Sequence, residues 1–153
     1  MSNSVLVTGL NHTSYTVRDI DRLLNFFVEG FKFTLISMGP RDQRSMEMMT
    51  AVPGADVIIA QLQAPGHRIE LIKFISPAET TVHDIKACDQ GFSHLAFDVT
   101  DIDEALAIAK SYGFTETCEP LPVSAGPNIG KFCVYLIDVD GLAIELIGGR
   151  NAN

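Results

Sequence analysis

The sequence has few cysteines and few basic residues, and each shortage excludes a class of protein. Cys88, Cys118 and Cys133 are odd in number and form no CxxC pair, so the sequence predicts neither a disulfide framework nor a zinc knuckle. We expect all three thiols to be reduced. Eleven lysines and arginines against 19 aspartates and glutamates give a net charge of −8. Nucleic acids and anionic membranes would be repelled by such a surface and are not expected as partners.

Long apolar stretches are also missing. Uninterrupted apolar runs, such as residues 57–60, are far shorter than the roughly 20 residues needed to span a bilayer. Residues 1–7 lack both the basic region and the apolar stretch of a secretory signal, so a cytoplasmic location is expected. The 153 residues, 46% of them hydrophobic, are enough for a single domain over residues 1–153 with a sizeable core.

Short sequence motifs occur twice in the chain, in the same order. The word VRDID at residues 17–21 is matched by VTDID at 99–103, and IELI at 69–72 recurs at 144–147. A histidine, His12 or His94, stands five residues before each VxDID word. The copies are 82 residues apart at these histidines and 75 apart at Glu70 and Glu145, so the second copy is seven residues shorter. This repetition predicts two modules, about 8–75 and 91–149, joined by a polar stretch.

Each module is predicted to run strand, helix and then three strands. Residues 10–17 and 93–99 alternate as strands do. His12 shares a strand face with Ser14 and Thr16, and His94 shares one with Ala96 and Asp98. Asp19 and Asp101 are expected to cap helices that end at Gly30 and Gly113. The other strands are expected at residues 33–37, 57–63, 68–74, 116–121, 131–137 and 142–147, with a hairpin turn at 138–141 and an ambiguous segment at 44–50.

Two histidines and two glutamates occupy equivalent positions in the repeat. Glu70 and Glu145 each interrupt an apolar strand, where burial of a lone carboxylate costs several kcal/mol. Taken singly, each residue fits the solvated face of a half-buried strand. Taken together, modules related by an internal twofold would bring His12, Glu70, His94 and Glu145 around one point. Such a set suits a divalent ion of Ni, Co, Zn, Mn or Fe and leaves two positions for neighbouring substrate oxygens.

These words resemble the vicinal oxygen chelate superfamily, which includes glyoxalase I, methylmalonyl-CoA epimerase, extradiol dioxygenases and fosfomycin-resistance proteins. The resemblance covers about residues 8–149 and is carried by segments at 10–20, 68–72, 91–97 and 135–146. It implies an α+β fold whose two tandem βαβββ modules form a cupped eight-stranded mixed sheet. It also implies one divalent metal ion per chain, bound by His12, Glu70, His94 and Glu145, and a homodimer. Phe26, Phe27 and Phe31 are candidates for either the dimer contact or the core.

The ligand pattern is similar to that of bacterial glyoxalase I and of the epimerase. It implies a lyase, isomerase or epimerase that acts on a small 2-oxo or 2-hydroxy compound through a metal-stabilised enediolate. Glu70 or Glu145 would then shuttle the proton. Two alternatives stay open, a ring-cleaving extradiol-type dioxygenase and a non-catalytic binding protein for small molecules. No tryptophan follows Glu70 as it commonly does in glyoxalase I, which argues against glutathione recognition.

Other chemically capable residues receive simpler interpretations. Glu47 is either a second acid/base or a solvated strand residue. His67 and His83 are interpreted as surface residues and Cys88 as an inert buried thiol. Residues 126–131 resemble a phosphate-binding loop only superficially, because the spacing differs and Phe132 replaces the usual Ser or Thr. They are interpreted as a loop that could close over the substrate.

Overall fold

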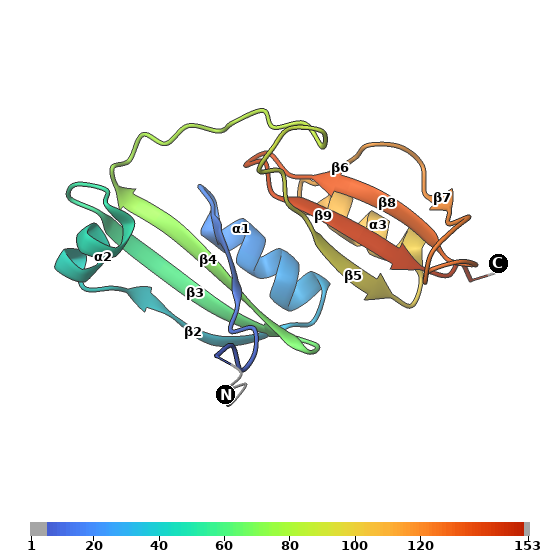
Figure 1. The fold of residues 1–153 in the computed structure, drawn as a ribbon, viewed down its shortest axis with the longest axis horizontal. Coiled ribbons are helices and arrows are strands. Elements are labelled where there is room, and N and C mark those ends of the chain that lie inside the picture. Colours follow the sequence, from blue (N-terminus) through green and yellow to red (C-terminus); the bar gives the residue numbers. More distant parts are fainter. Residues whose placement is uncertain (1–5, 152–153) are drawn as a thin grey trace, which may run out of the picture. The chain divides into compact units, whose positions relative to one another are not determined.

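A computed structural model of the chain describes residues 6–151 and confirms the predicted α+β class (Figure 1). Residues 1–5, part of the segment that lacks a secretory signal, lie outside the described residues. The first half contains β1 (Thr13–Thr16), α1 (Ile20–Asn25), η1 (Phe26–Gly30), β2 (Thr34–Pro40), α2 (Gln43–Thr50), β3 (Asp56–Ala64) and β4 (His67–Ser76). The second contains β5 (Leu95–Val99), α3 (Ile102–Ser111), β6 (Thr115–Glu116), β7 (Leu121–Pro122), β8 (Phe132–Ile137) and β9 (Ala143–Gly148).

The first sheet has the strand order β1-β4-β3-β2, with β1 parallel to β4 and the other pairs antiparallel. Glu70 lies in the middle of β4, between Ser14 of β1 and Gln61 of β3, which are its Cα partners. The ambiguous segment is the helix α2. It begins after Asp42, whose side chain accepts a hydrogen bond from Ser45 N at 2.8 Å. Its buried Met46 packs in a small core cluster with residues of β3.

The second sheet has the order β5-β9-β8-β6, and β7 also pairs with β8. The predicted strand at 116–121 is therefore two short strands, β6 and β7, so this sheet has five strands in the described part of the chain. Local signals in the second module are confirmed. Asp101 caps α3 by accepting from Asp103 N and Glu104 N, and Gly113 and Gly141 take positive φ values of 93° and 84° after α3 and in the β8–β9 turn.

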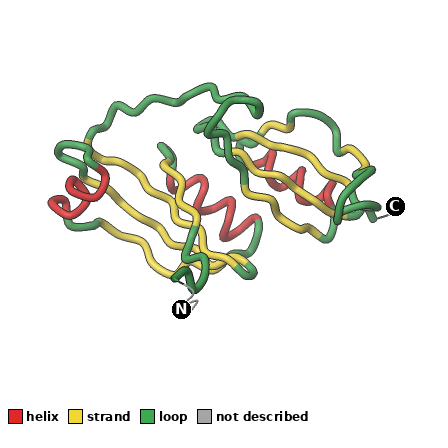
Figure 2. The backbone as a smooth tube through the Cα atoms, in the orientation of Figure 1, coloured by secondary structure: helices red, strands yellow, loops and turns green. Residues whose placement is uncertain are grey.

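Contacts divide the chain into two compact units, and the division does not follow the repeat. One unit comprises Met1–Ile20 and Lys32–Ala78, and the other comprises Asp21–Phe31 and Glu79–Asn153. In Figure 2 the long green stretch after β4 carries the chain from the first unit to the second. Residues 21–31, which include most of α1 and all of η1, thus belong to the unit that holds the second sheet.

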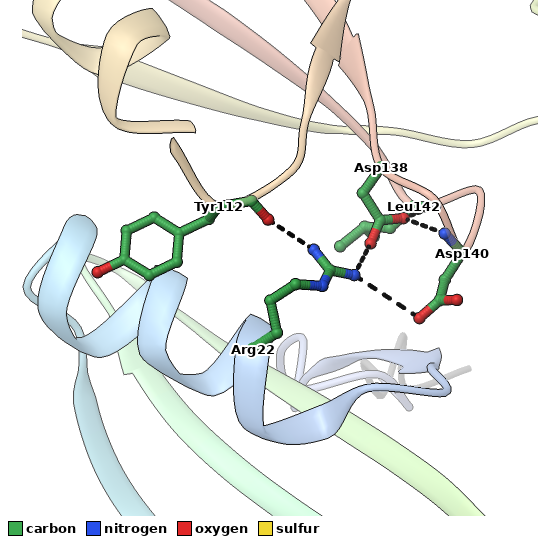
Figure 3. A network of polar contacts seen from close by, with 5 residues as sticks. All are labelled: Arg22, Tyr112, Asp138, Asp140 and Leu142. Carbon is green, nitrogen blue, oxygen red and sulfur yellow. Dashed lines mark hydrogen bonds and ion pairs between the residues drawn. The ribbon is translucent and has the colours of Figure 1, made fainter. Parts of the chain in front are cut away.

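Aromatic packing and one arginine explain why this helical segment belongs to the second unit. The Phe26 ring centroid lies 4.6 Å from that of Phe114, and the Phe31 centroid lies 5.7 Å from that of Phe97. Arg22 binds a buried carboxylate in the β8–β9 turn (Figure 3). Phe26 and Phe27 have no exposed surface, so of the two roles open to them they fill the core. None of the helices in the described residues is long and apolar enough to cross a membrane.

Gly148 marks a close approach between β9 and its parallel neighbour β5. A Cβ atom there would lie 2.4 Å from the carbonyl oxygen of Val99, which is backbone and cannot rotate away. We expect Gly148→Ala to lower the free energy of unfolding by about 1–3 kcal/mol. Gly149→Ala is the matched control, since a Cβ atom there would lie 3.9 Å from the carbonyl oxygen of Thr100, and we expect a change within about 0.5 kcal/mol. Urea denaturation measures both, and equal stabilities would contradict the prediction.

Candidate active site

The first imidazole–carboxylate pair lies on the first sheet. His12 stands directly before β1, and its Nε2 is 3.5 Å from Oε1 of Glu70. Ser14 Oγ donates to Oε1 of Glu70 at 3.0 Å, and Gln61 Nε2 donates to Oε2 at 3.1 Å. The side chain of Glu70 is only 11% exposed. The register therefore explains how a carboxylate can be buried in an apolar strand: both of its oxygens accept hydrogen bonds from neighbouring strands.

The contacts of His12 are compatible with a bound cation. Nδ1 of His12 is 2.8 Å from Oδ1 of Asn11, which accepts a hydrogen bond from the tautomer protonated at Nδ1. In that tautomer Nε2 is an acceptor, as is the carboxylate oxygen of Glu70 beside it. Two such acceptors are favourable neighbours only when a proton or a cation lies between them. Ligands that share one ion at about 2.1 Å each lie about 3 Å apart or slightly more, so the pair fits a metal.

The second pair repeats this arrangement on the second sheet. His94 stands directly before β5, and its Nε2 is 3.3 Å from Oε2 of Glu145 in the middle of β9. The Cα partners of Glu145 are Ala96 and Tyr135, in the places that Ser14 and Gln61 take beside Glu70. Within the described residues the carboxylate of Glu145 has no polar partner except His94. Glu145 is thus freer to move than Glu70.

Two aromatic rings lie beside His94 of the second pair. The ring centroid of His94 is 4.8 Å from that of Tyr135 and 6.1 Å from that of Phe92. Burial, and then the negative charge of Glu145, raise the pKa of Tyr135, so its hydroxyl keeps its proton at neutral and mildly alkaline pH. Tyr135 is therefore a hydrogen-bond donor next to the pair.

The structure brings the four predicted ligands together as two pairs, one in each unit. In the described part of the chain no group of three or more His, Cys, Asp or Glu side chains is arranged to hold a metal ion. The gathering of all four residues around one ion stays a prediction.

Three neighbours of the pairs were not among the candidate site residues: Ser14, Gln61 and Tyr135. Hairpin register could have identified two of them. Gln61 and Glu70 are equidistant from the turn after Ala64, and Tyr135 and Glu145 are equidistant from the turn at 138–142.

The remaining candidates lie outside these pairs. Glu47 is exposed on helix α2, so the expectation that it lies on a strand was wrong. His83 is exposed as expected, whereas His67 is half-buried and its Nε2 lies 2.9 Å from Thr13 Oγ1. Cys88 is exposed, which corrects the prediction of a buried thiol. It lies between β4 and β5, in a stretch where no helix or strand forms and most residues are exposed.

The sequence has relatives with named activities. The model of the Glyoxalase/Bleomycin resistance protein/Dioxygenase superfamily matches residues 9–146. A 2-epi-5-epi-valiolone epimerase from Actinomyces sp. is 27% identical over 91% of this chain and 78% of the epimerase. A lactoylglutathione lyase from Arabidopsis thaliana is 25% identical over 89% of this chain, but the match spans only 42% of the lyase.

Solved structures share the fold. A glyoxalase family protein from Bacillus cereus matches 99% of this chain and 100% of its own, with a TM-score of 0.81 and 23% identity. The fosfomycin resistance protein FosX from Listeria monocytogenes, solved with Mn(II) and 1S,2S-dihydroxypropylphosphonic acid, matches 95% of this chain and 93% of its own, with a TM-score of 0.60 and 18% identity. With the repeated modules and the family match over residues 9–146, the chain belongs to the Glyoxalase/Bleomycin resistance protein/Dioxygenase superfamily.

Proposed function

We propose that the protein is a divalent-metal-dependent epimerase, isomerase or lyase that moves a proton at the carbon beside a carbonyl in a small 2-oxo or 2-hydroxy compound. The observation that carries the proposal is the recurrence of an imidazole–carboxylate pair, with Nε2–O distances of 3.5 and 3.3 Å, at equivalent positions of the two modules. Similarity to an epimerase over most of both chains supports proton transfer over other chemistries of the superfamily.

We also propose which residues bind the metal ion and that both modules form one functional domain. His12, Glu70, His94 and Glu145 would supply the ligands of one ion, and the modules at about 8–75 and 91–149 would work as one domain over residues 1–153. Support comes from the repeat in the sequence and from the donor chemistry of each pair. When bound, the ion would polarise two neighbouring oxygens of the substrate and so acidify the adjacent C–H.

The two glutamates would have different roles. Glu70 is fixed by hydrogen bonds from Ser14 and Gln61, which suits a permanent ligand. Glu145 has no such bonds, so it can move and exchange a proton with the substrate carbon. The His94 ring lies beside the rings of Tyr135 and Phe92.

Metal content and proton exchange together test this function. We expect untagged protein to hold about one equivalent of Ni, Co, Zn, Mn or Fe per chain, and His12→Ala and His94→Ala each to lower the content. His83→Ala is the control, because His83 is exposed and outside both pairs. The metal-loaded protein should exchange the α-proton of at least one 2-oxo or 2-hydroxy compound with D2O, followed by proton NMR.

Two results would overturn the proposal. One is failure to take up any of the five metals. The other is uptake without proton exchange, and in that case oxygen consumption with catechols would indicate a ring-cleaving dioxygenase instead.

A further inference from the structure

A lysine–aspartate pair lies on the same face of the second sheet as Glu145. Lys131 Nζ is 2.6 Å from Oδ1 of Asp98 in β5. Asp98 follows Ala96, the Cα partner of Glu145, by two residues, so both lie on one face of the strand. Phe97, between them, turns the other way, since its ring contacts Phe31. The ion pair therefore belongs to the face that carries His94 and Glu145.

The backbone fixes the position of Lys131 just before β8. Its N–H donates to Asn128 O at 3.1 Å, and its carbonyl oxygen accepts from Val123 N at 2.9 Å. The register pairs Phe132 with Gly148, which places Lys131 opposite Gly149. From there the lysine side chain reaches Asp98 of β5, on the far side of β9. Two backbone hydrogen bonds therefore hold the residue that carries this cationic side chain.

The ion pair is open to competition. The side chains of Lys131 and Asp98 are 41% and 79% exposed, so water screens their attraction and the pair is weak. An incoming anion could replace Asp98 on the lysine without leaving a buried charge behind. Two residues along a strand span about 6–7 Å, so this position lies about that far from the level of Glu145.

We propose that Lys131 is an anion-binding residue of the candidate active site and that it selects substrates carrying a carboxylate or phosphate group. The anionic group displaces Asp98 from Lys131 while the reacting carbon lies at His94 and Glu145, about 7 Å along the sheet. The assignment of the reacting end rests on the proposed function. Anion binding by Lys131 stands on the Lys131–Asp98 geometry alone.

Binding of simple anions to metal-free protein tests the first part. The five lysines are dimethylated with 13C and followed by NMR while inorganic phosphate or acetate is added. We expect the Lys131 signal to shift saturably and Asp98→Asn to lower the Kd at least about threefold by removing the competing carboxylate. The Lys131 signal is assigned by its absence from the spectrum of Lys131→Gln. The two anions distinguish phosphate from carboxylate preference. Lys110, paired with Glu116 at the surface, is the control in the same spectra.

Two results of the titration would overturn the inference. In one, the Lys131 signal moves no more than that of Lys110 with either anion. In the other, Asp98→Asn leaves the Kd unchanged. Circular dichroism of each variant checks that it is folded.

The kinetic arm separates this inference from the proposed function. For an anionic substrate found by proton exchange, Lys131→Gln should raise KM at least tenfold with kcat within about threefold, and Lys110→Gln should change neither. An unchanged KM in Lys131→Gln would reject the inference and leave the proposed function intact. Saturable anion binding without proton exchange on any compound would reject the proposed function and leave the anion site intact.

Discussion

Replacing Glu145 with glutamine is expected to slow metal-dependent exchange of the substrate α-proton by about 10²–10⁴-fold, the range that general acid–base catalysis contributes. Glutamine has a similar shape but cannot take up a proton. The rate is measured by proton NMR in D2O and divided by the metal content of each sample, so that a lost ion is not mistaken for a lost base. A rate per metal within threefold of wild type would contradict the role of Glu145.

Two control variants make this expectation specific. Glu47→Gln changes an exposed carboxylate on α2 and should leave the rate nearly unchanged. If it slows exchange as much as Glu145→Gln, Glu47 is the acid/base that the sequence left open. Gln61→Leu removes one of the two hydrogen bonds that hold Glu70 and should weaken metal retention more than the rate per bound metal. This difference would separate a fixed ligand from a proton carrier.

The fold was predictable where local patterns decide it. The repeat predicted equivalent strands in the two halves, whose sheets have equivalent strand orders, and the cap at Asp101 and the stop at Gly113 lie where the structure has them. Helix α2 was missed because Met48 and Met49 are apolar but exposed, which blurs its periodicity. Asp42, followed three residues later by Ser45, was the available start signal. The strand expected at 116–121 is split by a change of register. Thr117 N donates to Tyr135 O and Leu121 pairs with Cys133, so more residues lie between Thr117 and Leu121 than between their partners on β8.

The candidate site was predictable only in part. The repeat identified both imidazole–carboxylate pairs, since equivalent residues occupy equivalent positions in the two copies. The repeat could not reveal that Glu70 is held by hydrogen bonds and Glu145 is not. This difference depends on their strand neighbours, which are Ser14 and Gln61 beside Glu70 but Ala96 and Tyr135 beside Glu145, and strand register decides which residues are neighbours. Packing of residues 21–31 in the second unit was also hidden. It depends on contacts between residues far apart in sequence, such as Phe26 with Phe114.

The largest loss of stability is expected from removing Arg22. Its guanidinium donates to Asp138 Oδ2 at 2.7 Å and to the carbonyl oxygen of Tyr112 at 2.8 Å, and it lies 3.8 Å from Asp140 Oδ2 (Figure 3). The Asp138 side chain is fully buried and also accepts from Asp140 N and Leu142 N. One arginine therefore ties helix α1 to the end of α3 and to the β8–β9 turn.

Arg22→Met keeps most of the side-chain volume but leaves the Asp138 carboxylate without its cation. Loss of one partner from a buried ion pair costs about 3–5 kcal/mol, and we expect urea denaturation to show a loss in this range. Arg150→Met is the matched control, because its ion pair with Asp103 is exposed on both sides and should contribute about 0–1 kcal/mol. Equal losses at the two positions would contradict the prediction. Adding Asp138→Asn to Arg22→Met should restore part of the stability, because the penalty comes from the uncompensated charge and not from the missing contact.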